Sequence, residues 1–123
     1  MGMRMKPKSQ AALDHHARLE VIRRLNDTLR TTGKGGTVVA TPGLAALDPG
    51  ILIAIVAAVR AFADFDTRND PYGEHDFGVV KAKGKRVMWK IDYFDADLHA
   101  HSPDAADPTK TKRVMTIMLA EEY

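Results

Sequence analysis

Ten residues in the middle of the chain, NDPYGEHDFG from Asn69 to Gly78, combine acids, a histidine and glycines directly before an apolar strand pattern. In an extended chain the side chains of Glu74 and Asp76 point to one side and His75 to the other. A hairpin with the next strand is expected to place Glu74 across from Asp95. Carboxylates held that close bind a cation, shift a pKa or pair with a base. The segment thus suggests a divalent-metal or general acid and base site, with Glu74, His75, Asp76 and Asp95 as candidate catalytic residues.

The same segment also has a structural interpretation. Asn69, Asp70 and Pro71 are typical turn residues, and Gly73 permits a bend that other residues resist. The acids would then cap backbone amides or face water. We expect a structural turn, with the metal-dependent enzyme, acting on nucleic acid for example, as the alternative.

A second group of polar residues lies in the loop DADLHAHSPDAAD, which begins at Asp95. His99 and His101 could reach one metal ion from an extended segment, with Asp104 or Asp107 completing the ligand set. A calcium loop is not indicated, because alanine stands where that motif needs its glycine and its glutamate. A solvated acidic loop is the simpler interpretation, so the sequence predicts no resident cofactor or metal.

Length and composition limit the classes of protein. A chain of 123 residues without cysteine predicts one domain, without a disulfide scaffold or a thiolate zinc site. The most apolar run, Ile51 to Ala63, is shorter than a membrane span and contains Arg60. We therefore expect a cytoplasmic protein with no membrane partner, consisting of a disordered basic leader over 1–8 and a single domain over 9–123.

Charge is divided along the chain. Residues 1–36 hold eight Lys and Arg against three acids, whereas residues 64–107 hold ten acids against six bases. This division argues against a uniformly basic nucleic-acid-binding protein and against an acidic mimic of DNA.

Periodicity predicts two helices and four strands. The helices run from Ser9 to about Arg30 and from Pro49 to about Phe65, with a short strand, TVVAT, between them. Apolar residues cover more than half of the second helix, so we expect it to be covered on two sides. The predicted class is α+β, with order α-β-α-β-β-β and two helices on one face of a small antiparallel sheet.

The segments FGVVKAK and RVMWKIDYF predict a hairpin around a tight turn at Gly84-Lys85. That turn pairs Trp89 with Val80 and Tyr93 with Asp76, so Val87, Trp89, Ile91 and Tyr93 share the core face. The opposite face then carries His75, Phe77, Lys81, Lys83, Met88, Lys90, Asp92 and Phe94. A long connection over 95–112 precedes a last strand from Arg113 to Leu119, and loops of that length are commonly functional.

The outer face of the predicted sheet is a candidate binding surface. Phe77 and Phe94 are flanked by cations, an arrangement that also occurs in proteins that bind single-stranded nucleic acid. The recognised RNA-binding consensus is absent, so a protein partner or self-association is favoured and nucleic acid remains an alternative. The candidate binding residues are Phe77, Lys81, Lys83, Arg86, Lys90, Asp92 and Phe94.

Three blocks of the chain, NDPYGEHDFG, WKIDYFD and SPDAADPTKTKRVMTIMLAEEY, resemble the signature blocks of a proteobacterial family of unknown function, often found on plasmids and other mobile elements. The usual pattern of that family has His where this chain has Tyr72, and Pro where it has Ala105. The resemblance implies no mechanism. Together with the residues it suggests a small accessory protein, leaning away from an enzyme, that binds a protein partner, with interference with a host defence as one expected role.

Overall fold

The computed structural model describes the backbone of residues 8–123 and the side chains from Asp14 onward. The predicted leader therefore lies outside the described residues, except for Lys8, which begins the first helix. The elements in chain order are α1 (Lys8–Thr32), β1 (Thr37–Ala40), α2 (Pro42–Ala45), α3 (Pro49–Ala61), β2 (Phe77–Ala82), β3 (Lys85–Phe94), β4 (Lys112–Leu119) and the 3₁₀ turn η1 (Ala120–Glu122).

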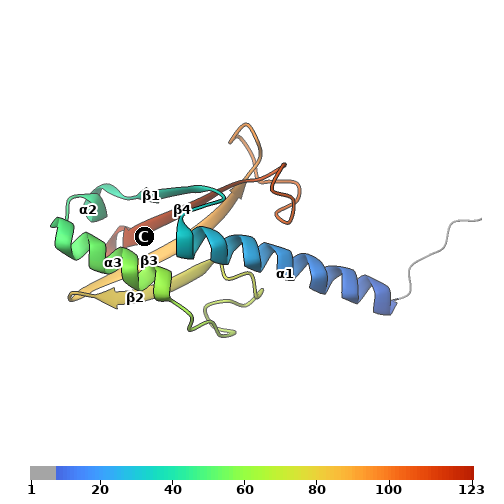
Figure 1. Cartoon of the computed structure of the whole chain (residues 1–123), viewed down its shortest axis with the longest axis horizontal. Coiled ribbons are helices and arrows are strands. Elements are labelled where there is room, and N and C mark those ends of the chain that lie inside the picture. The colour runs from blue at the N-terminus through green and yellow to red at the C-terminus, as the bar shows by residue number, and fades with distance from the viewer. Residues whose placement is uncertain (1–7) are drawn as a thin grey trace, which may run out of the picture.

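The strands form one sheet in the order β1-β4-β3-β2, and α1 and α3 pack on one face of it (Figure 1). The predicted α+β class and element order are confirmed. The prediction of a purely antiparallel sheet is wrong for β1, which pairs with β4 in parallel. β1 has only four residues and no hairpin partner, so its sequence does not indicate whether it pairs in parallel or antiparallel. The helix α3 that follows β1 returns the chain to the other end of the sheet before β2 begins.

The hairpin differs from the prediction by its register. Lys83 and Gly84 form the two-residue turn, with φ of 51° and 75°, instead of Gly84 and Lys85. Positive φ at both positions is the geometry of the hairpin turn that matches strand twist. Moving the turn by one residue shifts the register by two, so Trp89 faces Gly78 instead of Val80.

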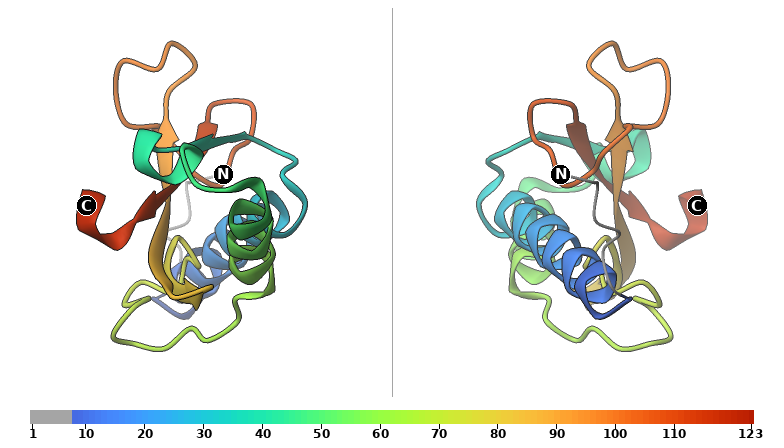
Figure 2. Two further views of the ribbon diagram at one scale, coloured as in Figure 1. Left: turned by 90° about the vertical axis from the view of Figure 1, so that its left-hand side faces the viewer. Right: turned by 90° about the vertical axis from the view of Figure 1, so that its right-hand side faces the viewer.

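A shift of two residues keeps every strand side chain on its predicted face. The predicted core residues Val87, Trp89, Ile91 and Tyr93 are therefore all buried, as the alternation indicated. Figure 2 shows the resulting layers, with helices on one side of the sheet and only η1 on the other side.

The helix α3 begins as predicted and ends early. Asp48 caps it, because its carboxylate accepts a hydrogen bond of 2.9 Å from the backbone N–H of Gly50. The predicted end near Phe65 is wrong, since Phe62 is already extended, with ψ of 129°. The rings of Phe62 and Phe65 instead meet Trp89 edge-on, at centroid distances of 5.7 and 6.1 Å. Packing against this indole outweighs about one more turn of helix. Among the described residues, no helix is long and apolar enough to cross a membrane.

The core around Trp89 generates a prediction at Gly78. A Cβ atom there would lie 2.6 Å from Nε1 of Trp89 and 2.9 Å from the ring of Phe62. Both rings are fixed by their neighbours, so Gly78→Ala should lower the free energy of unfolding by about 1 to 3 kcal/mol, measured by urea denaturation. The control is Gly50→Ala in the first turn of α3, which should be neutral or slightly stabilising. Equal effects of the two substitutions would contradict this packing.

Candidate functional site

The segment 64–76 is a turn held by its own side chains. Asp66 accepts hydrogen bonds from the backbone N–H of Arg68 and Asn69, and Asn69 in turn accepts one from the N–H of Asp66. These donors hold the pKa of Asp66 below its usual value, with the Arg68 side chain as the largest cause. Asp70 is buried, and its two oxygens lie 3.2 and 3.3 Å from the backbone nitrogen of His75, which donates to them. These contacts are those of a structural turn.

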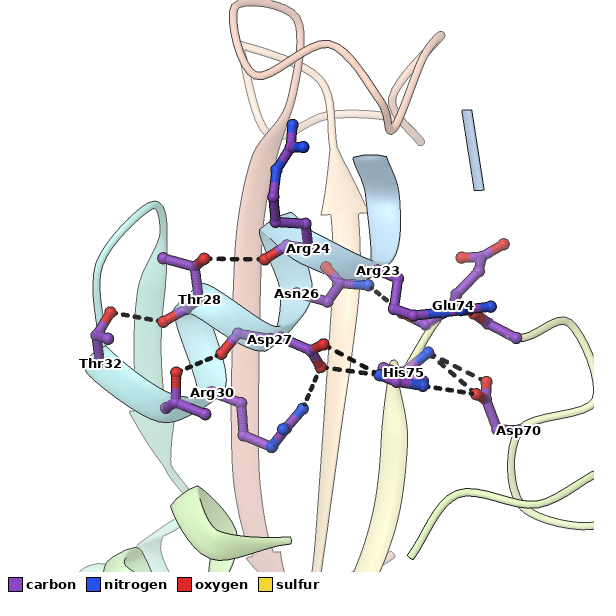
Figure 3. A network of polar contacts seen from close by, with 12 residues as sticks. Arg23, Arg24, Asn26, Asp27, Thr28, Arg30, Thr32, Asp70, Glu74 and His75 are labelled. Carbon is purple, nitrogen blue, oxygen red and sulfur yellow. Dashed lines mark hydrogen bonds and ion pairs between the residues drawn. The ribbon is translucent and has the colours of Figure 1, made fainter. Parts of the chain in front are cut away.

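Helix α1 clamps the far end of this turn. Nε of Arg23 donates to the backbone oxygen of Gly73 at 2.8 Å, and Nδ2 of Asn26 donates to the backbone oxygen of Glu74 at 3.0 Å. Two consecutive carbonyls of the turn are thus satisfied by side chains from a helix almost fifty residues earlier. The turn and α1 therefore form one unit (Figure 3).

A buried polar network extends from this unit into the sheet. The hydroxyl of Tyr93 lies 2.7 Å from both Asn26 Nδ2 and Glu74 Oε1, accepting from the amide and donating to the carboxylate. Nε of Arg113 donates to Oδ1 of Asn26 at 2.9 Å, and its guanidinium lies 5.2 Å from the centre of the Tyr93 ring. Arg113 also donates to the backbone oxygen of Ala105. The network therefore joins α1, the turn, β3, β4 and the long loop.

Burial is the main electrostatic influence on this network. It raises the pKa of Tyr93, and the hydrogen bond to Glu74 raises it further, because the ionised phenol would face a carboxylate. Burial also lowers the pKa of Arg113, although the nearby Tyr93 and Glu74 oppose that shift. The phenol thus stays protonated as a donor, and the guanidinium stays charged, since arginine does not lose its proton in proteins.

His75 is positioned differently from the prediction. Its φ of 57° breaks the strand alternation, so its ring lies on the helix side of the sheet instead of the predicted outer face. The Nδ1–H group donates to Asp27 of α1 at 2.9 Å, Nε2 lies 3.8 Å from Asp70, and the ring stacks on Phe65 at 3.8 Å (Figure 3). The stack and the two carboxylates hold the ring in place, which favours a role in joining α1 to the turn.

The predicted gathering of Glu74, Asp76 and Asp95 does not form. In the observed register Tyr93 takes the place opposite Glu74 that was predicted for Asp95. Asp95 instead accepts a hydrogen bond from the N–H of His99 within its own loop, which holds its pKa below the usual value. In the described part of the chain, no three His, Asp or Glu side chains are arranged to hold a metal ion.

The pKa of Asp76 is raised to about 6. Burial is the largest cause, and the neighbouring carboxylate of Glu74 adds to it, followed by Asp70 and Asp92. Its backbone oxygen accepts from the N–H of Ile91, which continues the hairpin ladder past the end of β2. The raised pKa is thus explained by the position of Asp76, a half-buried residue directly before β2.

The long connection over 95–111 is ordered by side-chain caps. His101 forms an isolated bridge with Phe94, and buried Ser102 contacts the hydroxyl of Thr111 at 2.7 Å. Asp104 binds Arg18 of α1 and the N–H of Ala106, and these donors hold its pKa low. His99 and His101 are exposed and share no metal-binding geometry with the loop acids. The loop acids thus serve as caps.

The predicted binding residues lie on the face of the sheet away from α1 and α3, except Lys83, which is in the turn. We call this surface the outer sheet face. Val79, Met88 and Met118 form an apolar row across it, of which Met118 is buried. Phe77, Lys90 and Thr116 form the next row along the strands, and Lys81, Arg86 and Lys112 lie at the ends of the face. Its apolar members are Val39, Phe77, Val79, Met88, Phe94, Val114 and Met118, and its charged members are Lys81, Arg86, Lys90, Asp92 and Lys112. Phe77 and Phe94 are separate, because Phe77 pairs with Lys90 and Phe94 lies about 13 Å further along β3.

Sequence reasoning missed the α1 and β4 members of the network, Asn26 and Arg113, and also Asp27, which binds His75 and, at 2.8 Å, Arg30. One signal was present at Asn26, which lies one helical turn from both Ile22 and Leu29, on the apolar stripe of α1. A polar residue in that position predicts a buried partner. A similar signal was present at Arg113, which alternates with Met115 and Ile117 on the core face of β4 and packs against Asn26, the Tyr93 ring and the backbone of Ala105.

The network predicts a specific cost for Tyr93→Phe. Loss of the hydroxyl leaves the carboxylate of Glu74 and the amide of Asn26 without their shared partner in a buried place. The free energy of unfolding should fall by about 1 to 3 kcal/mol, measured by urea denaturation. Tyr72→Phe is the matched control, because Tyr72 is 79% exposed. A Tyr93→Phe protein as stable as this control would contradict the network.

The raised pKa of Asp76 predicts a pH-dependent gain for Asp76→Asn. Because the folded-state pKa of about 6 exceeds the ordinary value of 3.8, ionisation costs stability as pH rises between these values. The substitution should therefore raise the free energy of unfolding at pH 8 by about 1 to 2 kcal/mol, allowing for solvent screening of a half-buried carboxylate. The gain should disappear below pH 3.8. Urea denaturation at both pH values tests this, and an equal gain at both would contradict it.

Comparison with known proteins agrees with the resemblance noted from the sequence blocks. A family model described as a protein of unknown function, DUF3768, matches residues 40–122, which contain the turn, all of β2 to β4 and the long loop. No curated protein and no solved structure gave a significant match. The matched region covers more than half of the chain, so the protein belongs to the DUF3768 family, whose function is unknown.

Proposed function

We propose that the protein is an interaction module that binds a protein partner through its outer sheet face. The single observation that carries this proposal is an apolar sheet surface that no helix covers (Figure 2). Two helices bury the other face, whereas among residues 14–123 only η1 lies over the outer sheet face, at the end where Met118 is buried. Sheets with one solvated face usually alternate apolar with polar side chains, and here much of the second face is apolar as well.

The composition of this face resembles a protein interface more than a nucleic-acid platform. Apart from the two phenylalanines, its apolar side chains belong to valine and methionine, which offer no ring on which a base could stack. Interfaces that mix apolar and charged side chains are typical of protein partners, and methionine is enriched in them. The two aromatic rings lie too far apart to hold neighbouring bases.

Charges on the rim indicate the chemistry of the partner. Lys81 and Arg86 are directly opposite each other in the β2–β3 pair, where like charges repel. Lys112 is exposed at the other end of the face, while Lys90 is paired with Asp92 at 3.0 Å. An acidic partner surface would relieve this repulsion and give rapid, salt-sensitive association.

The turn at Asn69 to Asp76 supports the outer sheet face from behind. Its polar groups are engaged with one another and with α1, which favours a structural role over chemistry on a substrate. The long loop begins where Phe94 ends β3 and is held there by the bridge to His101. It therefore extends the binding surface at that end.

In this proposal the protein acts in the cytoplasm as an accessory of a plasmid or another mobile element. Interference with a host defence is one such role. This setting rests on the resemblance of the sequence blocks alone.

Affinity capture tests the proposal with variants of the outer sheet face. The tagged protein should capture a protein from the lysate of its own host, identified by mass spectrometry. Lys90→Glu combined with Phe94→Ser should reduce that capture about tenfold or more, because it removes an apolar anchor and reverses a charge in the middle of the face. The control is Arg24→Glu on the exposed side of α1, which should capture the partner normally.

Two outcomes would contradict the proposal. Equal loss of the partner in the control variant would place the interface elsewhere, and capture of nucleic acid that nuclease abolishes would assign the face to a different class of ligand. Thermal unfolding of each variant shows whether it is folded.

A further inference from the structure

The helix α3 is apolar on the side that faces water as well as on the side that faces the core. Its first eleven residues, PGILIAIVAAV, contain no charged side chain. The sheet and α1 cover one side, where Ile55 and Val59 are fully buried. On the other side Ile53 is 71% exposed. Helices that are apolar all round are ordinarily buried, so this side of α3 is suited to a further partner.

The exposed side of α3 forms a shallow depression of about 410 Å³, lined by Leu52, Ile53, Val56, Ala57 and Arg60. We call these five residues the α3 surface. A small cavity of about 30 Å³ adjoins it, because Val56 and Arg60 line both, and there Val38 of β1 continues the apolar surface. Val38 is itself exposed to 45%. The apolar area therefore extends from α3 to the edge strand.

Two charged residues of opposite sign lie at the two ends of α3, and Arg30, which also lines the small cavity, is already paired with Asp27. Asp48 precedes the first turn and uses Oδ1 to cap Gly50, which leaves its other oxygen directed to solvent. Arg60 lies in the last turn, and no acidic side chain among residues 14–123 forms an ion pair with it. A surface with an acid at one end and a base at the other is complementary to itself after a two-fold rotation.

We infer that a second copy of this chain covers the α3 surface, with the two α3 helices antiparallel. A two-fold axis near Ala54 and Ile55 would place Ile53 against Val56 and Ala57 of the second copy. The same axis would bring Asp48 of each copy to Arg60 of the other. Thirteen residues span about 20 Å, so both ion pairs form at the ends of one continuous apolar contact.

The residue types agree with close packing of two helices. Ala54, Ala57 and Ala61 are small and allow the backbones to approach, while Ile53 provides a knob for the depression of the other copy. The antiparallel arrangement also places opposite ends of the two helix dipoles next to each other. One helix pair buries little area, so the dimer should be weak and depend on protein concentration.

This dimer is compatible with the proposed function. The α3 surface lies on the opposite side of the sheet from the outer sheet face (Figure 2), so two outer sheet faces would point away from each other. Each dimer would then offer two partner-binding faces and gain avidity for a repeated or dimeric partner.

Sedimentation analysis over a wide concentration series tests the dimer. The wild-type chain should pass from monomer to dimer as its concentration rises, and Ile53→Lys should raise the dissociation constant at least about tenfold. The matched control is Tyr72→Lys, which also places lysine at a highly exposed apolar position and should leave the dimer unchanged. A wild-type chain that stays monomeric throughout, or a dimer that Ile53→Lys leaves intact, would overturn the inference.

A charge-swapped pair tests the antiparallel orientation. Arg60→Glu leaves two acids at each end of a homodimer, and Asp48→Lys leaves two bases, so each variant alone should dimerise at least about tenfold more weakly. An equal mixture should restore association, because the heterodimer regains an opposite pair at both ends. A mixture that associates no more strongly than either variant alone would overturn the antiparallel arrangement. Thermal unfolding of Asp48→Lys is measured alongside, because Asp48 also caps α3.

Discussion

The structure depends on one buried contact, where the amide of Asn26 meets the hydroxyl of Tyr93, the carbonyl of Glu74 and the guanidinium of Arg113. Each of these groups comes from a different element, and none can return to water while the fold is intact. An unpaired member would cost more than the bond contributes, so the contact favours one arrangement of helix, turn and strands. Side chains from α1 and β3 thereby hold the segment NDPYGEHDFG in place, which explains its dense polar composition.

Outside this buried network, two apolar surfaces of the protein are exposed to solvent. The outer sheet face has cations at its ends and suits an acidic protein. The α3 surface contains Arg60, and Asp48 lies at the opposite end of the same helix, so this side of α3 suits a second copy of the chain. The sheet separates the two, so neither proposed contact obstructs the other. A small domain built this way would work by holding partners together, and its most polar segment would serve the scaffold.

Sequence reasoning predicted the features that follow from periodicity. The α+β class, the order of elements and the core face with Trp89 and Tyr93 follow from apolar alternation and are observed. The turn register was missed because Lys83, a residue without special freedom, takes a positive φ beside Gly84. The same kind of backbone conformation moved His75 to the helix side. The partnership of Asn26 with Tyr93 and Arg113 joins residues 67 and 87 positions apart, and one sequence offers no signal at that separation.

The central claim is that the outer sheet face is the binding surface and that the polar turn is structural. Methyl NMR of the protein titrated with its captured partner would test this most directly, because valine and methionine methyl groups mark the outer face. The account predicts that the signals of Val79, Met88 and Val114 shift or broaden, while those of the core residues Val59 and Met115 stay in place. Unchanged outer-face methyl signals, with shifts confined to backbone amides of Asp70 to Asp76, would contradict it and make the turn the working site.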